Sequence, residues 1–146
     1  MRWRYRLDRP ACGEFRSLAG LDFANAWLSI HDGWMRVSEG YAWDGCSPSL
    51  RIPGAGLWVG TPDGPLGSDG RPVAWRASLF HDALCQFRGV IPGLTAEAAT
   101  AVFAGLLAAD GAPYWMQRIY PAAVLRFGPQ DFMGDIERAW AVPKSE

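Results

Sequence analysis

The stretch from residue 72 to residue 88, PVAWRASLFHDALCQFR, constrains the fold of this chain more than any other. At helical spacing its apolar residues form one row with a flanking pair: Trp75, Leu79, Ala83 and Phe87, with Phe80 and Leu84 beside them. A broad apolar stripe of this kind is typical of a buried helix. We expect Pro72 at the first helical position, where its missing N–H does no harm.

The segments before this helix are patterned as strands. Residues 2–7, RWRYRL, alternate arginines with apolar residues, which predicts a half-buried strand. Its arginine face is either a solvated edge or a contact for phosphate or an acidic partner. Residues 26–30 and 34–38 are β-prone runs around the turn His31-Asp32-Gly33, which predicts a hairpin with a solvated His31 at its tip.

Residues 49–70 are rich in glycine and proline and predict a loop, with at most a short strand at 57–59. Loops of about 20 residues are unusual inside a compact domain. We interpret this one either as a segment that faces a partner or as a variable insertion.

Two more helices are expected after residue 94. Thr95 is the expected N-cap of the first and Gly111 its stop. Its predicted buried face consists of Ala99, Val102, Phe103, Leu106 and Leu107. The second begins at Pro113 and ends at Gly128, with a kink or break expected at Pro121. Its predicted apolar stripe consists of Trp115, Met116, Ile119, Tyr120 and Val124.

The order of strands first and helices after predicts a single α+β domain over residues 1–146. We expect an N-terminal strand and a β-hairpin packed on a C-terminal bundle of about three helices. Residues 130–146 are weakly patterned, so we expect a weakly ordered tail there.

Composition excludes several classes of function. With 49% hydrophobic and 20% charged residues the chain is expected to fold, and its net charge of −1 predicts no binding to nucleic acid. No apolar run approaches the ~20 residues needed to span a bilayer, so no membrane insertion is expected. We expect no secretion by a signal of its own, because no apolar segment follows Met1. Cys12, Cys46 and Cys85 are interpreted as reduced thiols in a cytoplasmic setting or in a particle assembled there.

His81 and Asp82, in the middle of the long helix, are the candidates for chemistry. In a metal site, His81, Asp82 and Asp44 would bind a divalent ion such as zinc, with Cys46 or Cys85 as further ligands. His81 and Cys85 are four residues apart and share one helix face, whereas His81 and Asp82 point about 100° apart. No CxxC or HExxH spacing supports the site.

A nucleophilic site is the second alternative. Ser47 or Cys46 would attack, His81 would act as base, and Asp82 or Asp44 would orient the imidazole. No G-x-S-x-G elbow is present.

The third alternative is structural, and it is the one the sequence favours. His81 would then donate to a loop carbonyl or to Asp44, while Asp82 would cap a turn or pair with an arginine such as Arg76. Both groups would be satisfied, as buried polar groups must be, without any catalysis.

Three short motifs occur in a recognisable order. They are Asp-Gly-Cys-Ser-Pro at 44–48, Leu-Phe-His-Asp-Ala-Leu at 79–84, and a Tyr-x-x-Ala-Val-x-x-Phe-Gly-like close at 120–128. With this order the chain, over about residues 40–128, resembles the phage-related DUF1353 family, small proteins encoded in tailed bacteriophages and prophages.

Two positions depart from the family pattern. The family tends to carry an aromatic residue where Cys85 stands, and its Ala-Asp pair in the second helix is Ala99-Thr100 here. If that acid serves a site with His81 and Asp82, the resemblance implies that this chain has lost the activity.

What the resemblance implies is phage origin rather than a defined activity. With eight tryptophans and the long Gly/Pro loop, we expect an interaction or structural protein of the virion tail or baseplate. Its expected partners are other phage proteins or further copies of itself, its expected location is the virion or the host cytoplasm, and no cofactor is expected. The alternative is a small hydrolase, metal-dependent or centred on His81 and Asp82, that acts on cell wall or another host polymer. A host-directed inhibitor outside the virion is a third alternative.

Overall fold

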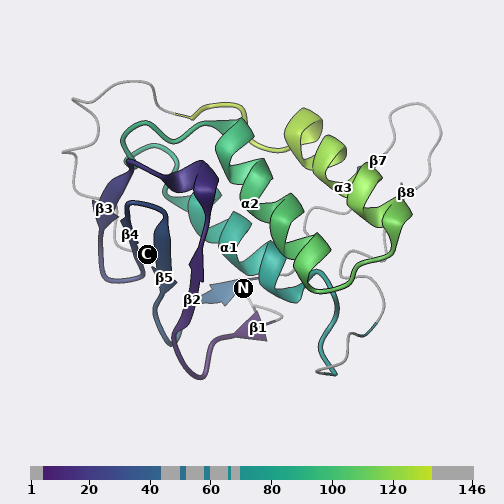
Figure 1. The fold of residues 1–146 in the computed structure, drawn as a ribbon, viewed down its shortest axis with the longest axis horizontal. Helices are drawn as coiled ribbons and strands as arrows, with labels where there is room; N and C mark the ends of the chain where they lie inside the picture. Colours follow the sequence, from purple (N-terminus) through teal and green to yellow (C-terminus); the bar gives the residue numbers. More distant parts are fainter. Residues whose placement is uncertain (1–4, 44–49, 52–57, 60–65, 67–69, 133–146) are drawn as a thin grey trace.

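The computed structural model describes residues 5–43, 50–51, 58–59, 66 and 70–132. Within them the chain has an α+β fold in which strands precede helices, as predicted (Figure 1). The strands are β1 (Tyr5–Arg6), β2 (Ala11–Glu14), β3 (Asp22–Ala24), β4 (Leu28–His31), β5 (Trp34–Val37), β6 (Ala42–Trp43), β7 (Leu50–Arg51) and β8 (Trp58–Val59). A 3-10 helix, η1 (Arg16–Leu18), follows β2, and the α-helices are α1 (Trp75–Gln86), α2 (Ala96–Ala109) and α3 (Tyr114–Phe127).

The main sheet has four antiparallel strands in the order β2-β5-β4-β3. The predicted hairpin is confirmed as β4 and β5, joined through Asp32 and Gly33, which have positive φ angles of 41° and 92°. This geometry fits the two-residue hairpin turn whose twist matches the strands. His31 pairs with Trp34 across the hairpin, so it ends the strand and is not part of the turn itself. Strands β2 and β3 were not predicted.

The predicted N-terminal strand is present as β1, in which Tyr5 pairs with Trp43 and Arg6 with Ala42 of β6. Arg6 is exposed and Leu7 is buried, which fits the predicted alternation. Residues 2–4 lie outside the described part of the chain. The short strand expected at 57–59 is β8, which pairs with β7.

Helix α1 is the centre of the fold, although it begins at Trp75 and not at Pro72. Pro72 forms an isolated bridge with Leu66, and its carbonyl accepts a hydrogen bond from Trp75 N–H. The prediction for Pro72 was therefore wrong, because a β-type bridge and a turn come before the helix. The buried residues of α1 spread over a broad arc: Ala77, Ser78, Leu79, Phe80, Ala83, Leu84 and Cys85.

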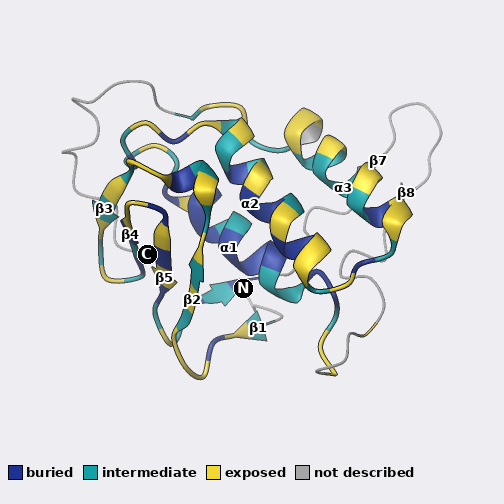
Figure 2. Ribbon diagram, viewed as in Figure 1, coloured by how far each residue is buried: buried dark blue, intermediate teal, exposed yellow. Residues whose placement is uncertain are grey.

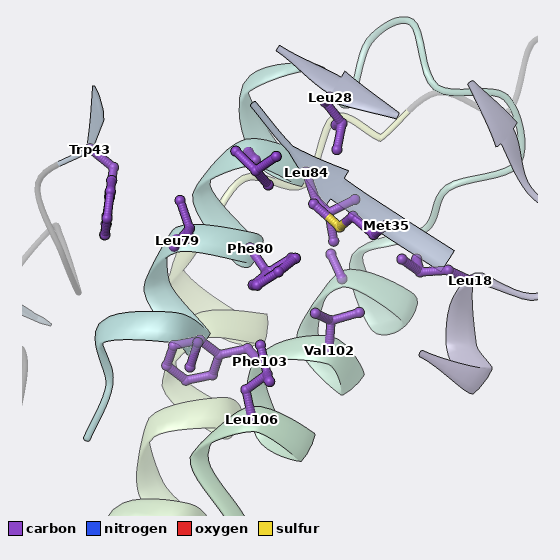
Figure 3. Packing of buried hydrophobic residues seen from close by; sticks show 14 of the residues in the cluster. Leu18, Leu28, Met35, Trp43, Leu79, Phe80, Leu84, Val102, Phe103 and Leu106 are labelled. Atoms are coloured by element: carbon purple, nitrogen blue, oxygen red, sulfur yellow. The ribbon is translucent and has the colours of Figure 1, made fainter. Parts of the chain in front are cut away.

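The core lies between the four-stranded sheet and the helices (Figure 3). Leu84 lies close to Met35 and Leu28 of the sheet, and Val102 of α2 lies near Leu18 of η1. The outer side of the sheet is exposed in alternate positions, as in Arg36. This alternation explains why β4 and β5 were predictable from sequence.

The boundaries and buried face of α2 agree with the prediction. The Thr95 side chain accepts from Ala98 N–H at 3.0 Å. At the other end, Gly111 has φ +76°, its N–H bonds to Ala108 O, and Ala112 N–H bonds to Leu107 O. These two bonds form the Schellman motif, which needs a left-handed residue after the helix.

Helix α3 differs from the prediction in its buried face. Of the kink or break expected at Pro121, the break is absent, because the helix continues through Pro121 to Phe127. The predicted apolar stripe is buried only in part, because Met116 is buried whereas Trp115 and Ile119 are 53% and 52% exposed. Residue 116 is the first of a row spaced by four that faces the core. Residues 115 and 119 lie on one side of it, about 100° and about 60° round the helix.

Candidate functional site

His81 and Asp82 lie in the middle of α1. The other predicted members of the site, Asp44, Cys46 and Ser47, lie outside the described residues. The described part of the chain therefore contains one half of the candidate site.

Trp43 is the last described residue before the segment that carries Asp44, Cys46 and Ser47. Its indole N–H donates to the hydroxyl of Ser78 at 3.2 Å, and its ring meets Trp75 edge-on at 5.0 Å between centroids. Ser78 in turn donates to the carbonyl of Trp75 at 3.0 Å. Trp43 directly precedes Asp44, and Ser78 is three residues before His81. The segment that carries Asp44 therefore starts on α1, about one helical turn from His81.

The described partner of His81 is Cys85 in the next turn of α1. The sulfur lies 3.5 Å from Nε2 and 3.7 Å from Nδ1 of the imidazole. The edge of the His81 ring meets Phe103 of α2 at 5.5 Å between centroids. The expected contact of residues four apart on a helix face is confirmed for this pair.

Burial sets the protonation of both groups. It lowers the pKa of His81 to about 4, because the cation loses its hydration. It raises the pKa of Cys85 to about 12, an effect that the charge of Asp82 increases and that of Arg88 opposes. At neutral pH the imidazole is therefore uncharged and the thiol is protonated. A protonated thiol is a poor nucleophile, whereas a neutral imidazole can bind a metal or accept a proton.

Metal binding would need more donors than this pair supplies. Within the residues that the structure describes, no group of three or more His, Cys, Asp or Glu side chains could hold a metal ion. His81 and Cys85 provide two donors of the kind zinc prefers, and zinc sites use three or four protein ligands.

Ion pairs of two arginines connect both ends of α1 to neighbouring segments. Arg76, named above as a partner for Asp82, forms a two-pronged ion pair with Asp110, with N–O distances of 2.6 to 3.1 Å. At the other end, Arg88 bonds to both carboxylate oxygens of Asp131 at 2.8 and 3.2 Å. These contacts fix α1, and with it His81 and Asp82, against the end of α2 and the segment that follows α3.

Thr100 is the α2 residue at which the resemblance led us to expect an acid. Its hydroxyl donates to Ala96 O at 2.7 Å, one turn earlier in α2. This bond to its own helix is the common use of a threonine in a helix interior. It supplies no charge to the surroundings of His81.

Sequence reasoning missed an aromatic cluster beside this region. Tyr41 stacks on Trp43, Tyr5 packs against the same indole, and Arg71 lies 4.2 Å above the ring of Trp75. The spacing of Tyr41 and Trp43, two residues apart where the chain enters β6, was the only local sign that they share a face. The cluster holds β1 and β6 on the N-terminal half of α1.

A second feature missed from sequence is the exposed apolar side of α3. Tyr114, Trp115 and Ile119 are 72%, 53% and 52% exposed. Arg118 lies over the ring of Tyr114 at 5.7 Å and donates to its hydroxyl at 3.2 Å. Side chains of this size are normally directed to the interior of a domain, and clusters of them at a surface mark binding sites.

Comparison of the chain with protein-family models, with curated sequences and with solved structures gave no match. Among the described helices, none is long and apolar enough to cross a membrane.

Proposed function

We propose that this chain is an interaction and structural protein of a tailed bacteriophage, a component of the virion tail or baseplate. The observation that carries the interaction part is the exposed apolar side of α3, formed by Tyr114, Trp115 and Ile119. Aromatic residues in such positions contribute most of the binding energy in protein interfaces. Phage origin rests on the three ordered motifs of the resemblance described above.

The chemistry around His81 supports interaction over catalysis. The Cys85 thiol is held protonated by burial, and Thr100 stands where the family carries an acid. The Arg76–Asp110 ion pair and the contact of His81 with Phe103 are typical of the packing between two helices. In this proposal His81 has a structural role in α1.

The test is mass spectrometry of purified phage particles. We expect the chain at a fixed ratio to known tail proteins, and we expect the ratio to survive high-salt washing. Its presence in the infected cytoplasm but not in particles would overturn the virion assignment.

One observation favours a second candidate, a hydrolase centred on His81, Asp82, Asp44 and Ser47. Trp43 brings the chain onto α1 immediately before Asp44, and His81 is neutral, as a metal ligand or a general base must be. If this candidate is correct, purified protein will contain stoichiometric zinc or another divalent metal. The variant His81→Ala will then lose the metal and remain folded by circular dichroism, whereas Thr100→Ala, the control on α2, will keep it.

A further inference from the structure

Helices α2 and α3 lie side by side, and exposed residues of both are turned to the same side of the molecule in Figure 2. We name this surface the α2/α3 face. From the exposed positions of the two helices we assign to it Ala101, Gly105 and Ala108 of α2 and Tyr114, Trp115 and Ile119 of α3.

The two halves of the α2/α3 face differ in relief. The α3 half projects, because its members are large aromatic and aliphatic side chains. The α2 half is flat, since Ala101, Gly105 and Ala108 are spaced by four and three along one side of the helix. A Cβ atom added at Gly105 would meet nothing within 4 Å, so this side of α2 is open to an incoming group.

The two halves also differ in charge. The charged residues of α2 and its C-cap are Glu97 and Asp110, whereas those of α3 are Arg118 and Arg126. Glu97 is exposed, and Asp110 already binds Arg76. The acidic group that the flat half offers is therefore Glu97, whereas the projecting half carries the basic Arg118 and Arg126.

We propose that the α2/α3 face binds a second copy of this chain about a twofold axis, so that α3 of each copy lies on α2 of the other. A twofold interface uses the same patch on both copies, so the patch must be complementary to itself. The α2/α3 face meets this condition in shape and in charge, because it contains a ridge and a flat row, and a basic and an acidic helix.

The size of the face predicts a reversible dimer. Two helices of 14 residues give a face about 21 Å long and about 20 Å wide. This footprint is about 400 Å² per copy, roughly half of what a standard specific interface buries on each partner, and is the size of a weak, transient contact. Screening of the opposite charges should also weaken the dimer as salt concentration rises.

This inference rests on the proposed function, because it names the partner of the same surface. The test is sedimentation velocity of the full chain over a range of protein and salt concentrations. We expect a monomer–dimer equilibrium whose dissociation constant rises at least about tenfold in Trp115→Ser. We expect a similar rise in Gly105→Arg, which places a long side chain on the flat row without loss of helix propensity.

Trp34→Ser is the matched control, because Trp34 is 56% exposed on the outer side of the sheet, close to the exposure of Trp115. It should leave the dissociation constant unchanged. A wild-type chain that is monomeric at every concentration, or an equal effect of the two tryptophan variants, would refute the second copy as the partner.

Particle incorporation separates this inference from the proposed function. If the wild-type chain is monomeric but Trp115→Ser is lost from particles that contain the wild type, the α2/α3 face binds a different virion protein. The dimer is then refuted and the proposed function stands. If the wild-type chain dimerises but is absent from particles, the dimer stands and the virion assignment fails.

Discussion

Trp43 and Ser78, 35 residues apart in sequence, are joined by a hydrogen bond of 3.2 Å from the indole N–H to the hydroxyl. This bond connects the last described residue before the Asp44 segment to the helix that carries His81. It shows that the chain packs on α1 at the residue just before Asp44.

Two substitutions separate the contribution of the Trp43 N–H to the free energy of unfolding from that of the aromatic ring. Trp43→Phe removes the donor and keeps an aromatic ring, so we expect a loss of about 1 kcal/mol for the bond, plus a share for the smaller ring. Trp43→Ala also removes the packing on Trp75 and should cost about 3 to 5 kcal/mol. Urea unfolding measures both. Equal losses in the two variants would show that the hydrogen bond, and not the ring, dominates.

The ion pair between Arg76 and Asp110 predicts an asymmetry between its two partners. Asp110 is the C-cap of α2, where the helix dipole disfavours a negative charge. Arg76→Ala leaves that charge in place, whereas Asp110→Asn removes it. Because both side chains are partly exposed, we expect losses of only about 1 kcal/mol, with the larger loss in Arg76→Ala. A double-mutant cycle in urea checks this, and a larger loss in Asp110→Asn would contradict it.

Burial of His81 predicts a dependence of stability on pH. The pKa of His81 is about 4 in the folded chain and near 6.5 in the unfolded chain. Between these values the unfolded chain binds a proton that the folded chain does not, so stability falls as pH decreases through this window. The full effect is on the order of 3 kcal/mol.

We expect His81→Gln to remove this fall in the free energy of unfolding, measured by urea unfolding at a series of pH values between 7 and about 4. His31→Gln, at the exposed end of β4, controls for the loss of a histidine. An unchanged acid profile in His81→Gln would show that His81 is not buried as described.

Replacing Gly105, inside α2, and Gly111, just after it, by alanine should change the stability of the protein in opposite directions. At Gly111, φ is +76° and nothing lies within 4 Å, so Gly111→Ala should destabilise by about 1 kcal/mol through backbone strain alone. Gly105 lies inside the helix with open space around it, so Gly105→Ala should stabilise by about 0.5 to 1 kcal/mol. Thermal unfolding at low protein concentration measures both shifts. A Gly111→Ala variant that is as stable as the wild type or more stable would contradict the Schellman geometry, and a destabilised Gly105→Ala variant would contradict the open space at Gly105.

The helices were predictable because their information is local. Thr95, Gly111 and the apolar period of α2 specify its boundaries and its buried face without reference to other segments. The contact of His81 with Cys85 was predictable for the same reason, since residues four apart meet on a helix.

The features that could not be predicted from the sequence depend on tertiary contacts. Strand β2 carries no apolar alternation. It forms because Ala11 to Glu14 pair with β5 at the edge of the hairpin, with partners 20 to 26 residues further along the chain. On α3, apolar residues occur on more than one side, so the period alone could not show that Trp115 and Ile119 stay outside. The Trp43–Ser78 bond likewise depends on how β6 packs against α1.

The pairing of β1 with β6 has a consequence for the order of folding. Tyr5 pairs with Trp43, so all four strands of the main sheet lie within the loop that this pairing closes. A short hairpin such as β4–β5 forms at small entropic cost. Pairing β1 with β6 closes a much longer loop, and this pairing becomes favourable only after the strands inside the loop have folded. We therefore expect β1 to join last and to open first, so that its amides exchange with solvent faster than those of β5 while the hairpin remains intact.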